Sequence, residues 1–185
     1  MNEFRVLAIS GSLRRGSYST GLLRAVREDA PKGIAVELYD GLDRIPPFNQ
    51  DLEHDPPAAV RDLNARIEAA DALLIATPEY NGSVPGTLKN ALDWASRPHG
   101  EGALAGKPVA VIGSSPSPFG AAWAQEHLRR ALALSGAVVL EDELKLGRVD
   151  ERFVNGRLSD RGTRNELAAL VSSLAELATA SSLAA

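Results

Sequence analysis

The sequence of 185 residues contains no cysteine, and this absence removes several kinds of chemistry at once. Without a thiol the chain forms no disulfide, has no thiolate nucleophile and offers no cysteine ligand to a metal. Histidine is nearly as scarce, because His54, His99 and His127 lie far apart and form neither H-x-H nor H-E-x-x-H spacing. We therefore expect no metal site, and we expect each histidine to be a surface residue rather than a ligand.

Long hydrophobic runs are also missing. No uninterrupted apolar segment approaches the roughly 18 residues that a membrane-spanning helix needs. The chain opens directly into its first expected strand, so we expect no signal peptide and predict a cytoplasmic protein. The net charge of −4 gives no field that would favour nucleic acid or an anionic membrane. The ordinary hydrophobic fraction of 44% and the length predict one domain over residues 1–185.

What the sequence does contain is an alternation of short apolar runs with segments of helical periodicity. This alternation is typical of a doubly wound α/β fold, with a parallel sheet and helices on both faces. Residues 40–57 form a long proline-rich loop, which we expect to be either a functional lid or a tethered surface loop. The expected strands lie at residues 4–9, 34–39, 71–77, 109–112 and 137–140, and the last expected helix lies at 161–178.

Three of the expected strands end in loops rich in glycine, serine and proline, at residues 10–20, 78–86 and 113–120. Ligands of an open α/β sheet bind outside the carboxyl ends of the strands, where the strand order reverses. With the order 2-1-3-4-5, the three loops follow three adjacent strands. This order is also that of flavodoxin, which binds flavin mononucleotide (FMN) at its switch point. The convergence therefore favours a mononucleotide site.

The first of these loops has the composition of a phosphate cradle. It lies between a strand and a helix, so amide groups of the first helical turn and the helix dipole favour an anion there. Hydroxyl groups and a guanidinium would strengthen that interaction. The loop matches neither G-x-G-x-x-G nor the Walker pattern, and an ordinary polar turn with a helix cap is the alternative.

Four spaced motifs together resemble the NADPH-dependent FMN reductase family, which includes soluble quinone, chromate and azo-dye reductases. The resemblance runs from the first strand to the helix after Gly120, and the segment beyond Glu143 adds little to it. The motifs are Gly-Ser-Leu-Arg-Arg-Gly-Ser at 11–17, Pro-Glu-Tyr-Asn-Gly-Ser-Val-Pro-Gly at 78–86, Leu-Lys-Asn-Ala-Leu-Asp-Trp at 88–94 and Leu-Ala-Gly-Lys-Pro at 104–108.

This resemblance implies a set of residues that bind the cofactor, and no catalytic side chain, because the chemistry takes place on the flavin. We expect Glu79 to be a structural carboxylate that bonds loop amides. Gly82 stands where many members carry an aromatic residue, so we expect a less covered flavin face. By resemblance, Ser12, Arg14, Ser17 and Ser19 hold the FMN phosphate and Tyr18 covers it or packs beside it; Pro78, Glu79, Tyr80, Asn81, Gly82 and Ser83 line the isoalloxazine; and Ser114, Ser115 and Gly120 close the remaining side.

The implied activity is hydride transfer from NADPH or NADH to FMN, followed by a ping-pong transfer of electrons to a small-molecule acceptor. The acceptor would be a quinone, a free flavin, an azo dye or an oxidised metal ion. One alternative is a flavodoxin-type electron carrier without its own NAD(P)H turnover, and another is a flavin-free regulatory or scaffold protein. The resemblance also implies a homodimer or homotetramer. Trp94 and Trp123 are candidate contacts, although a tryptophan more commonly lies in the core.

Overall fold

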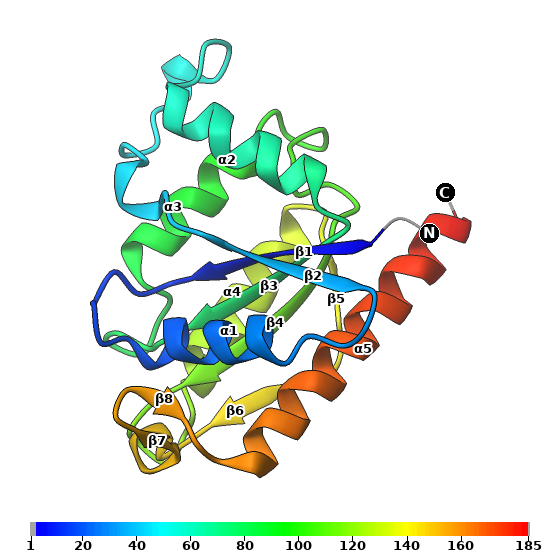
Figure 1. Cartoon of the computed structure of the whole chain (residues 1–185). Coiled ribbons are helices and arrows are strands. Elements are labelled where there is room, and N and C mark those ends of the chain that lie inside the picture. The colour runs from blue at the N-terminus through cyan, green and yellow to red at the C-terminus, as the bar shows by residue number, and fades with distance from the viewer. Residues whose placement is uncertain (1–2, 185) are drawn as a thin grey trace.

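The computed structural model describes residues 3–184, which form a central parallel sheet covered by helices on both faces (Figure 1). The strand order is β2-β1-β3-β4-β5, and every pair along it is parallel. The predicted flavodoxin-like, doubly wound fold with order 2-1-3-4-5 is thereby confirmed. The strands on this path are β1 (Phe4–Ser10), β2 (Ile34–Tyr39), β3 (Ala72–Thr77), β4 (Pro108–Ser114) and β5 (Val138–Val139).

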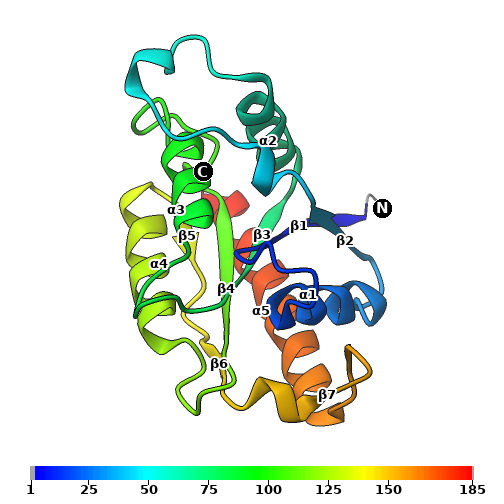
Figure 2. The same cartoon turned by 90° about the vertical axis from the view of Figure 1, so that its left-hand side faces the viewer.

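The helices bury two separate hydrophobic clusters, because successive side chains of a strand point to opposite faces of the sheet. Leu7 and Ile9 of β1 pack with α2, α3 and α4, whereas Val6 and Ala8 pack with α1 and α5. Figure 2 shows α3 and α4 on one side of β4 and α1 and α5 on the other. The helices are α1 (Tyr18–Glu28), α2 (Ala58–Ala69), α3 (Gly86–Ala95), α4 (Ala122–Leu134) and α5 (Arg161–Ala184), which extends six residues beyond the prediction.

The fifth position of the sheet differs from the single strand expected at 137–140. It holds two short segments, because β5 pairs with the start of β4 and β6 (Leu144–Leu146) pairs with its end. Three acidic residues at 141–143 separate them, and acidic side chains are poor strand formers. Arg129 donates to the Leu140 carbonyl at 2.7 Å, which holds this interruption against α4.

The long loop 40–57 is fastened to α3. Asn90 accepts a hydrogen bond from the Phe48 amide at 2.7 Å and donates one to the Pro46 carbonyl at 2.9 Å. The indole Nε1 of Trp94 donates to the same carbonyl at 2.9 Å, and the Phe48 ring packs edge-on against Trp94 at 4.9 Å. These contacts favour the tethered surface loop over the lid. The loop contains two 3-10 turns, η1 (Leu42–Arg44) and η2 (Gln50–Leu52).

The two tryptophans therefore have different positions. Trp94 is 1% exposed and belongs to the core, so the suggestion that it forms an oligomer contact is wrong. Trp123, on α4, is 49% exposed and stays available on the surface.

A β-hairpin lies between β6 and α5, where the sequence pattern suggested no element. It consists of β7 (Phe153–Val154) and β8 (Arg157–Leu158), and the 3-10 turn η3 (Val149–Arg152) precedes it. Asn155 and Gly156 connect the strands with φ angles of 50° and 74°, the combination found in a type I′ turn. An Asn-Gly pair between short apolar runs is a recognised hairpin signal, so this element was open to prediction.

The motif at 104–108 has a scaffold role on the opposite edge of the sheet from the three loops. The Lys107 ammonium donates to the Ala70 carbonyl at 2.6 Å, and burial lowers the pKa of this lysine. Lys107 thus ties the start of β4 to the end of α2. In the described part of the chain, no helix is long and apolar enough to cross a bilayer.

Candidate functional site

The loops that follow β1, β3 and β4 lie together at the carboxyl edge of the sheet. The Gly11 amide donates to the Ala76 carbonyl of β3 at 2.8 Å, which continues the pairing of β1 with β3 into the first loop. The hydroxyl groups of Ser12 and Tyr80 lie 3.5 Å apart and connect the first loop to the second. These contacts join the first two loops, and the strand order, with β4 parallel to β3 and beside it, brings the third loop to the same edge, as predicted.

The first loop leads into α1 through a serine cap. The Ser17 side chain accepts from the Thr20 amide at 3.2 Å, and its own amide donates to the Arg14 carbonyl at 3.0 Å. The helix begins at Tyr18, earlier than the start near Gly21 that periodicity suggested, because this cap satisfies the first turn. The first turn of α1 contains no acidic residue, although such positions favour carboxylates.

Arg14 has the side chain best suited to an anion at this helix start. Its guanidinium carbon lies 5.4 Å from the centroid of the Tyr18 ring, a cation–π arrangement. Within residues 3–184 the Arg14 guanidinium forms no ion pair. The Arg14 guanidinium thus lies next to the start of α1, and neither has an acidic partner within residues 3–184.

Ser19 and Ser114 are both buried. They are 1% and 3% exposed, and their hydroxyl oxygens are 2.8 Å apart. In this structure the two hydroxyls satisfy each other and join α1 to the end of β4. Their position supports the first and third loops from beneath.

The second loop is a tight turn. Tyr80 and Ser83 exchange amide-to-carbonyl hydrogen bonds at 3.1 Å, and Asn81 and Gly82 between them have φ angles of 52° and 69°. Both central residues therefore have the left-handed backbone of a type I′ turn, which favours Asn-Gly. No other atom lies within 4 Å of the point where a Cβ of residue 82 would stand. A Cβ there would meet no neighbour, but any side chain would strain the left-handed backbone.

Glu79 caps α4 across the site. Its Oε2 accepts from the amides of Trp123 at 3.0 Å and Ala124 at 3.1 Å, in the first turn of that helix. The residue at the N-cap position of α4, Ala121, has a methyl side chain and makes no capping hydrogen bond itself. The expectation that Glu79 is a structural carboxylate bonding amides is confirmed, although the amides belong to a helix start rather than to its own loop.

His127 is a neighbour of the site that sequence reasoning did not include. Its Nδ1 lies 3.1 Å from the Ser83 hydroxyl, so α4 holds the second loop at a further point. All three histidines are exposed, as expected. Within residues 3–184 no group of three or more acidic or histidine side chains could hold a metal ion.

The third loop is fastened to β6 rather than to the other two loops. The Ser115 amide donates to the Leu146 carbonyl at 3.1 Å, and the Ser115 and Ser117 hydroxyls are 3.0 Å apart. Gly120 lies against the backbone of Lys145 so closely that a Cβ would stand 2.6 Å from the Lys145 carbonyl carbon. The short segment β6, which follows the interruption of the fifth strand, therefore fixes the third loop.

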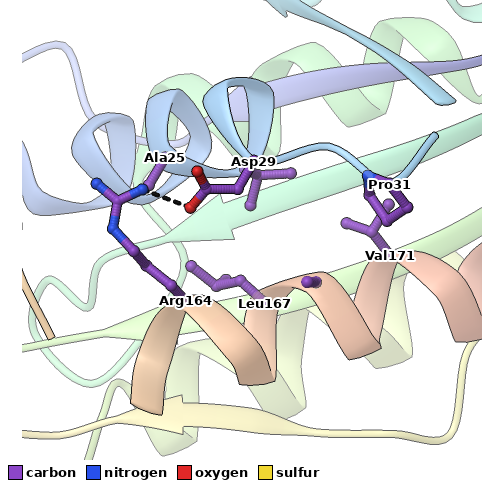
Figure 3. A pocket seen from close by; sticks show the side chains of 8 residues that line it. Ala25, Asp29, Pro31, Arg164, Leu167 and Val171 are labelled. Carbon is purple, nitrogen blue, oxygen red and sulfur yellow. Dashed lines mark hydrogen bonds and ion pairs between the residues drawn. The ribbon is translucent and has the colours of Figure 1, made fainter. Parts of the chain in front are cut away.

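A separate crevice lies between α1 and α5, away from the three loops (Figure 3). An ion pair between Arg164 and Asp29 spans it, and Leu167 and Val171 of α5 line it, with Val171 beside Pro31. The crevice has no room for a water-sized sphere. It is a packing seam, and the convergent polar groups of the three loops are the better candidate for a binding site.

Comparisons with known proteins match this arrangement. Residues 4–150 match the sequence model of a family described as NADPH-dependent FMN reductase. The chain is 44% identical to an NAD(P)H-dependent FMN reductase of Pseudomonas aeruginosa, over 88% of this chain and 89% of that protein. It is 40% identical to a 2-hydroxy-1,4-benzoquinone reductase of a Burkholderia species, over 88% and 90%. The flavoenzyme NAD(P)H:(acceptor) oxidoreductase FerB of Paracoccus denitrificans superposes with a TM-score of 0.85 at 36% identity, over 95% of this chain and 97% of that one.

Proposed function

The chain belongs to the NADPH-dependent FMN reductase family, and from this membership we propose that it is a quinone reductase whose two substrates use one pocket in turn. It is an oxidoreductase with FMN as its cofactor and NAD(P)H as its electron donor. When bound, FMN supplies the redox chemistry by accepting a hydride and giving up electrons. The chain's own residues bind the cofactor, orient it and leave one face of its ring open.

The observation that carries the proposal is the donor set at the start of α1. A phosphate dianion requires positive charge and hydrogen-bond donors. This loop offers a guanidinium that forms no ion pair within residues 3–184, hydroxyl groups and the amides of a helix start whose first turn has no acid. The residues present therefore fit FMN. We propose that Ser12, Arg14, Ser17 and Tyr18 hold its phosphate. The buried hydroxyls of Ser19 and Ser114 would support this site from beneath.

The second and third loops would hold the ring. The second is fixed on α4 at Glu79 and Ser83, so its amides keep their directions while substrates exchange. Donors that face the ring stabilise negative charge on its reduced form. The residues proposed to line the ring are Pro78, Glu79, Tyr80, Asn81, Gly82, Ser83, Ser115 and Gly120.

The names of the relatives support a quinone as the acceptor, since the Burkholderia protein is a 2-hydroxy-1,4-benzoquinone reductase and one from Pseudomonas putida is a quinone reductase. Free flavins, azo dyes and oxidised metal ions are the other acceptors that the family resemblance implies. The alternative of a flavodoxin-type carrier predicts no turnover of NAD(P)H, and a flavin-free scaffold predicts no FMN binding. NAD(P)H turnover separates the reductase from both alternatives, and binding of added FMN separates the carrier from the scaffold.

The expected kinetic result is a set of parallel double-reciprocal lines. Initial rates of NADPH oxidation by the FMN-loaded protein are measured over a range of 1,4-benzoquinone concentrations at several fixed NADPH concentrations. Parallel lines indicate that the first product leaves before the second substrate binds. Intersecting lines would contradict the shared pocket. If the FMN-loaded protein oxidises neither NADPH nor NADH, the result would favour the carrier. Protein freed of FMN is the matched control, and we expect it to be inactive until FMN is restored.

We also propose that the protein is a homodimer or homotetramer. The exposed aromatic pair Phe119 and Trp123, whose rings lie 5.3 Å apart beside the third loop, supports a contact there. Light scattering should then give two or four times the chain mass of 19.6 kDa. A mass of one chain at micromolar concentration would contradict this proposal.

A further inference from the structure

The Arg14 side chain is held from behind by an aromatic stack that continues into the C-terminal part of the chain. Its guanidinium lies over the Tyr18 ring, and the Tyr18 ring packs edge-on against Phe153 with centroids 5.1 Å apart. This spacing lies within the range favoured for edge-to-face aromatic pairs. Arg14 and Phe153 thus contact the same ring although 139 positions separate them in the sequence.

Phe153 has little freedom to leave this position. Its ring lies over Gly21 of α1, where a Cβ would stand 2.6 Å from the Phe153 Cε1. Any larger residue at 21 would displace the ring, so the glycine is what lets the hairpin approach the helix. Figure 1 shows the β7–β8 hairpin beneath the first turns of α1.

The hairpin itself is anchored at the start of α5. Asp160 accepts hydrogen bonds from the amide and the hydroxyl of Thr163 at 2.7 Å and 2.6 Å. Arg152 donates to the same hydroxyl at 2.7 Å, and the Arg152 carbonyl accepts from the Ser159 amide at 2.9 Å. These bonds close the two ends of the hairpin on each other, so Phe153 is presented by a fixed element and not by a free loop.

We propose that Phe153 is a positioning residue of the FMN phosphate site, which acts by holding Tyr18 and through it Arg14; this inference rests on the proposed function. An arginine side chain loses much rotamer freedom when it binds a ligand. A guanidinium already stacked on a fixed ring loses less, so the stack raises the affinity for a phosphate. The effect concerns the phosphate alone, because neither Phe153 nor the hairpin belongs to the loops proposed to hold the ring.

The test compares the affinity for FMN with that for riboflavin, which carries the same ring without a phosphate. Phe153→Leu keeps an apolar side chain in the hairpin but removes the aromatic edge. We expect it to weaken FMN binding about three- to tenfold, the usual size of a stacking contribution, and to leave riboflavin binding unchanged. Val154→Ala changes the neighbouring side chain, which is 58% exposed, and should alter neither affinity.

The same measurement in the Arg14→Ala background identifies the route of the effect. With Arg14 gone, Phe153→Leu should no longer change the FMN affinity, because the residue it positions is missing. An undiminished effect in that background, or an equal loss for riboflavin, would show that Phe153 acts only on the general fold and would overturn the inference. If Arg14→Ala itself leaves the preference for FMN over riboflavin intact, the proposed phosphate site fails first. The two failures are therefore distinguishable.

Discussion

Arg14→Ala is expected to raise the dissociation constant for FMN about ten- to a hundredfold while leaving the affinity for riboflavin unchanged. The guanidinium forms no ion pair within residues 3–184 and lies next to a helix start without an acid. A hydrogen bond to a charged group contributes about 1.5–3 kcal/mol, and each 1.4 kcal/mol corresponds to a tenfold change in affinity. Fluorescence titration of the FMN-free protein with each flavin measures both constants.

Two variants control this prediction. Arg14→Lys keeps the charge but loses the planar fork, so its FMN affinity should fall between the wild type and alanine. Arg15→Ala removes the adjacent exposed cation, which does not stack on Tyr18, and should have a smaller effect that salt reduces further. Equal losses for Arg14→Ala and Arg15→Ala would indicate a diffuse attraction to the loop. An unchanged FMN affinity in Arg14→Ala would contradict the phosphate assignment.

Much of the fold could be predicted from the sequence because its signals are local. The run at 72–77 is buried at every position, so a continuous apolar stretch was sufficient to identify a central strand. The order of the strands followed from the alternation of strands and helices together with the three unusual loops. Ser17 entered the candidate site through the family resemblance, and its role as the cap of α1 is a finding of the structure.

The contacts that assemble the site depend on distant parts of the chain, and no local pattern reveals them. Ser19 meets Ser114, which lies 95 positions away, and no local pattern places their hydroxyl oxygens 2.8 Å apart. His127 approaches Ser83 only because α4 packs beside the second loop. The position of the third loop also depends on a distant contact, because Gly120 packs against Lys145 of β6, the strand that follows the interruption.

Glu79 illustrates both sides of this limit. The structural role of its carboxylate could be predicted, because a carboxylate in a turn-rich loop finds amides to bond. That those amides start another helix, 44 positions away, could not. The consequence is that Glu79 joins two functions: it caps α4 and it fixes the loop proposed to hold the flavin ring.

Glu79→Ala is therefore expected to lower the free energy of unfolding by about 2 kcal/mol, since it leaves the amides of Trp123 and Ala124 without their charged acceptor. Glu79→Gln keeps a neutral acceptor and should lose about half as much. Urea unfolding measures both values, and Glu126→Ala, which changes an exposed carboxylate on the same helix, should be nearly neutral.

Glu79→Ala should also weaken FMN and riboflavin binding by equal factors, because Glu79 fixes the loop proposed to hold the ring and not the loop proposed to hold the phosphate. This outcome is the opposite of that expected for Arg14→Ala, where only FMN is affected. Flavin titrations of the two variants therefore separate the ring side of the site from the phosphate side. If Glu79→Ala lost affinity for FMN alone, the assignment of the second loop to the ring would be contradicted. If its free energy of unfolding were unchanged, α4 would not depend on this cap.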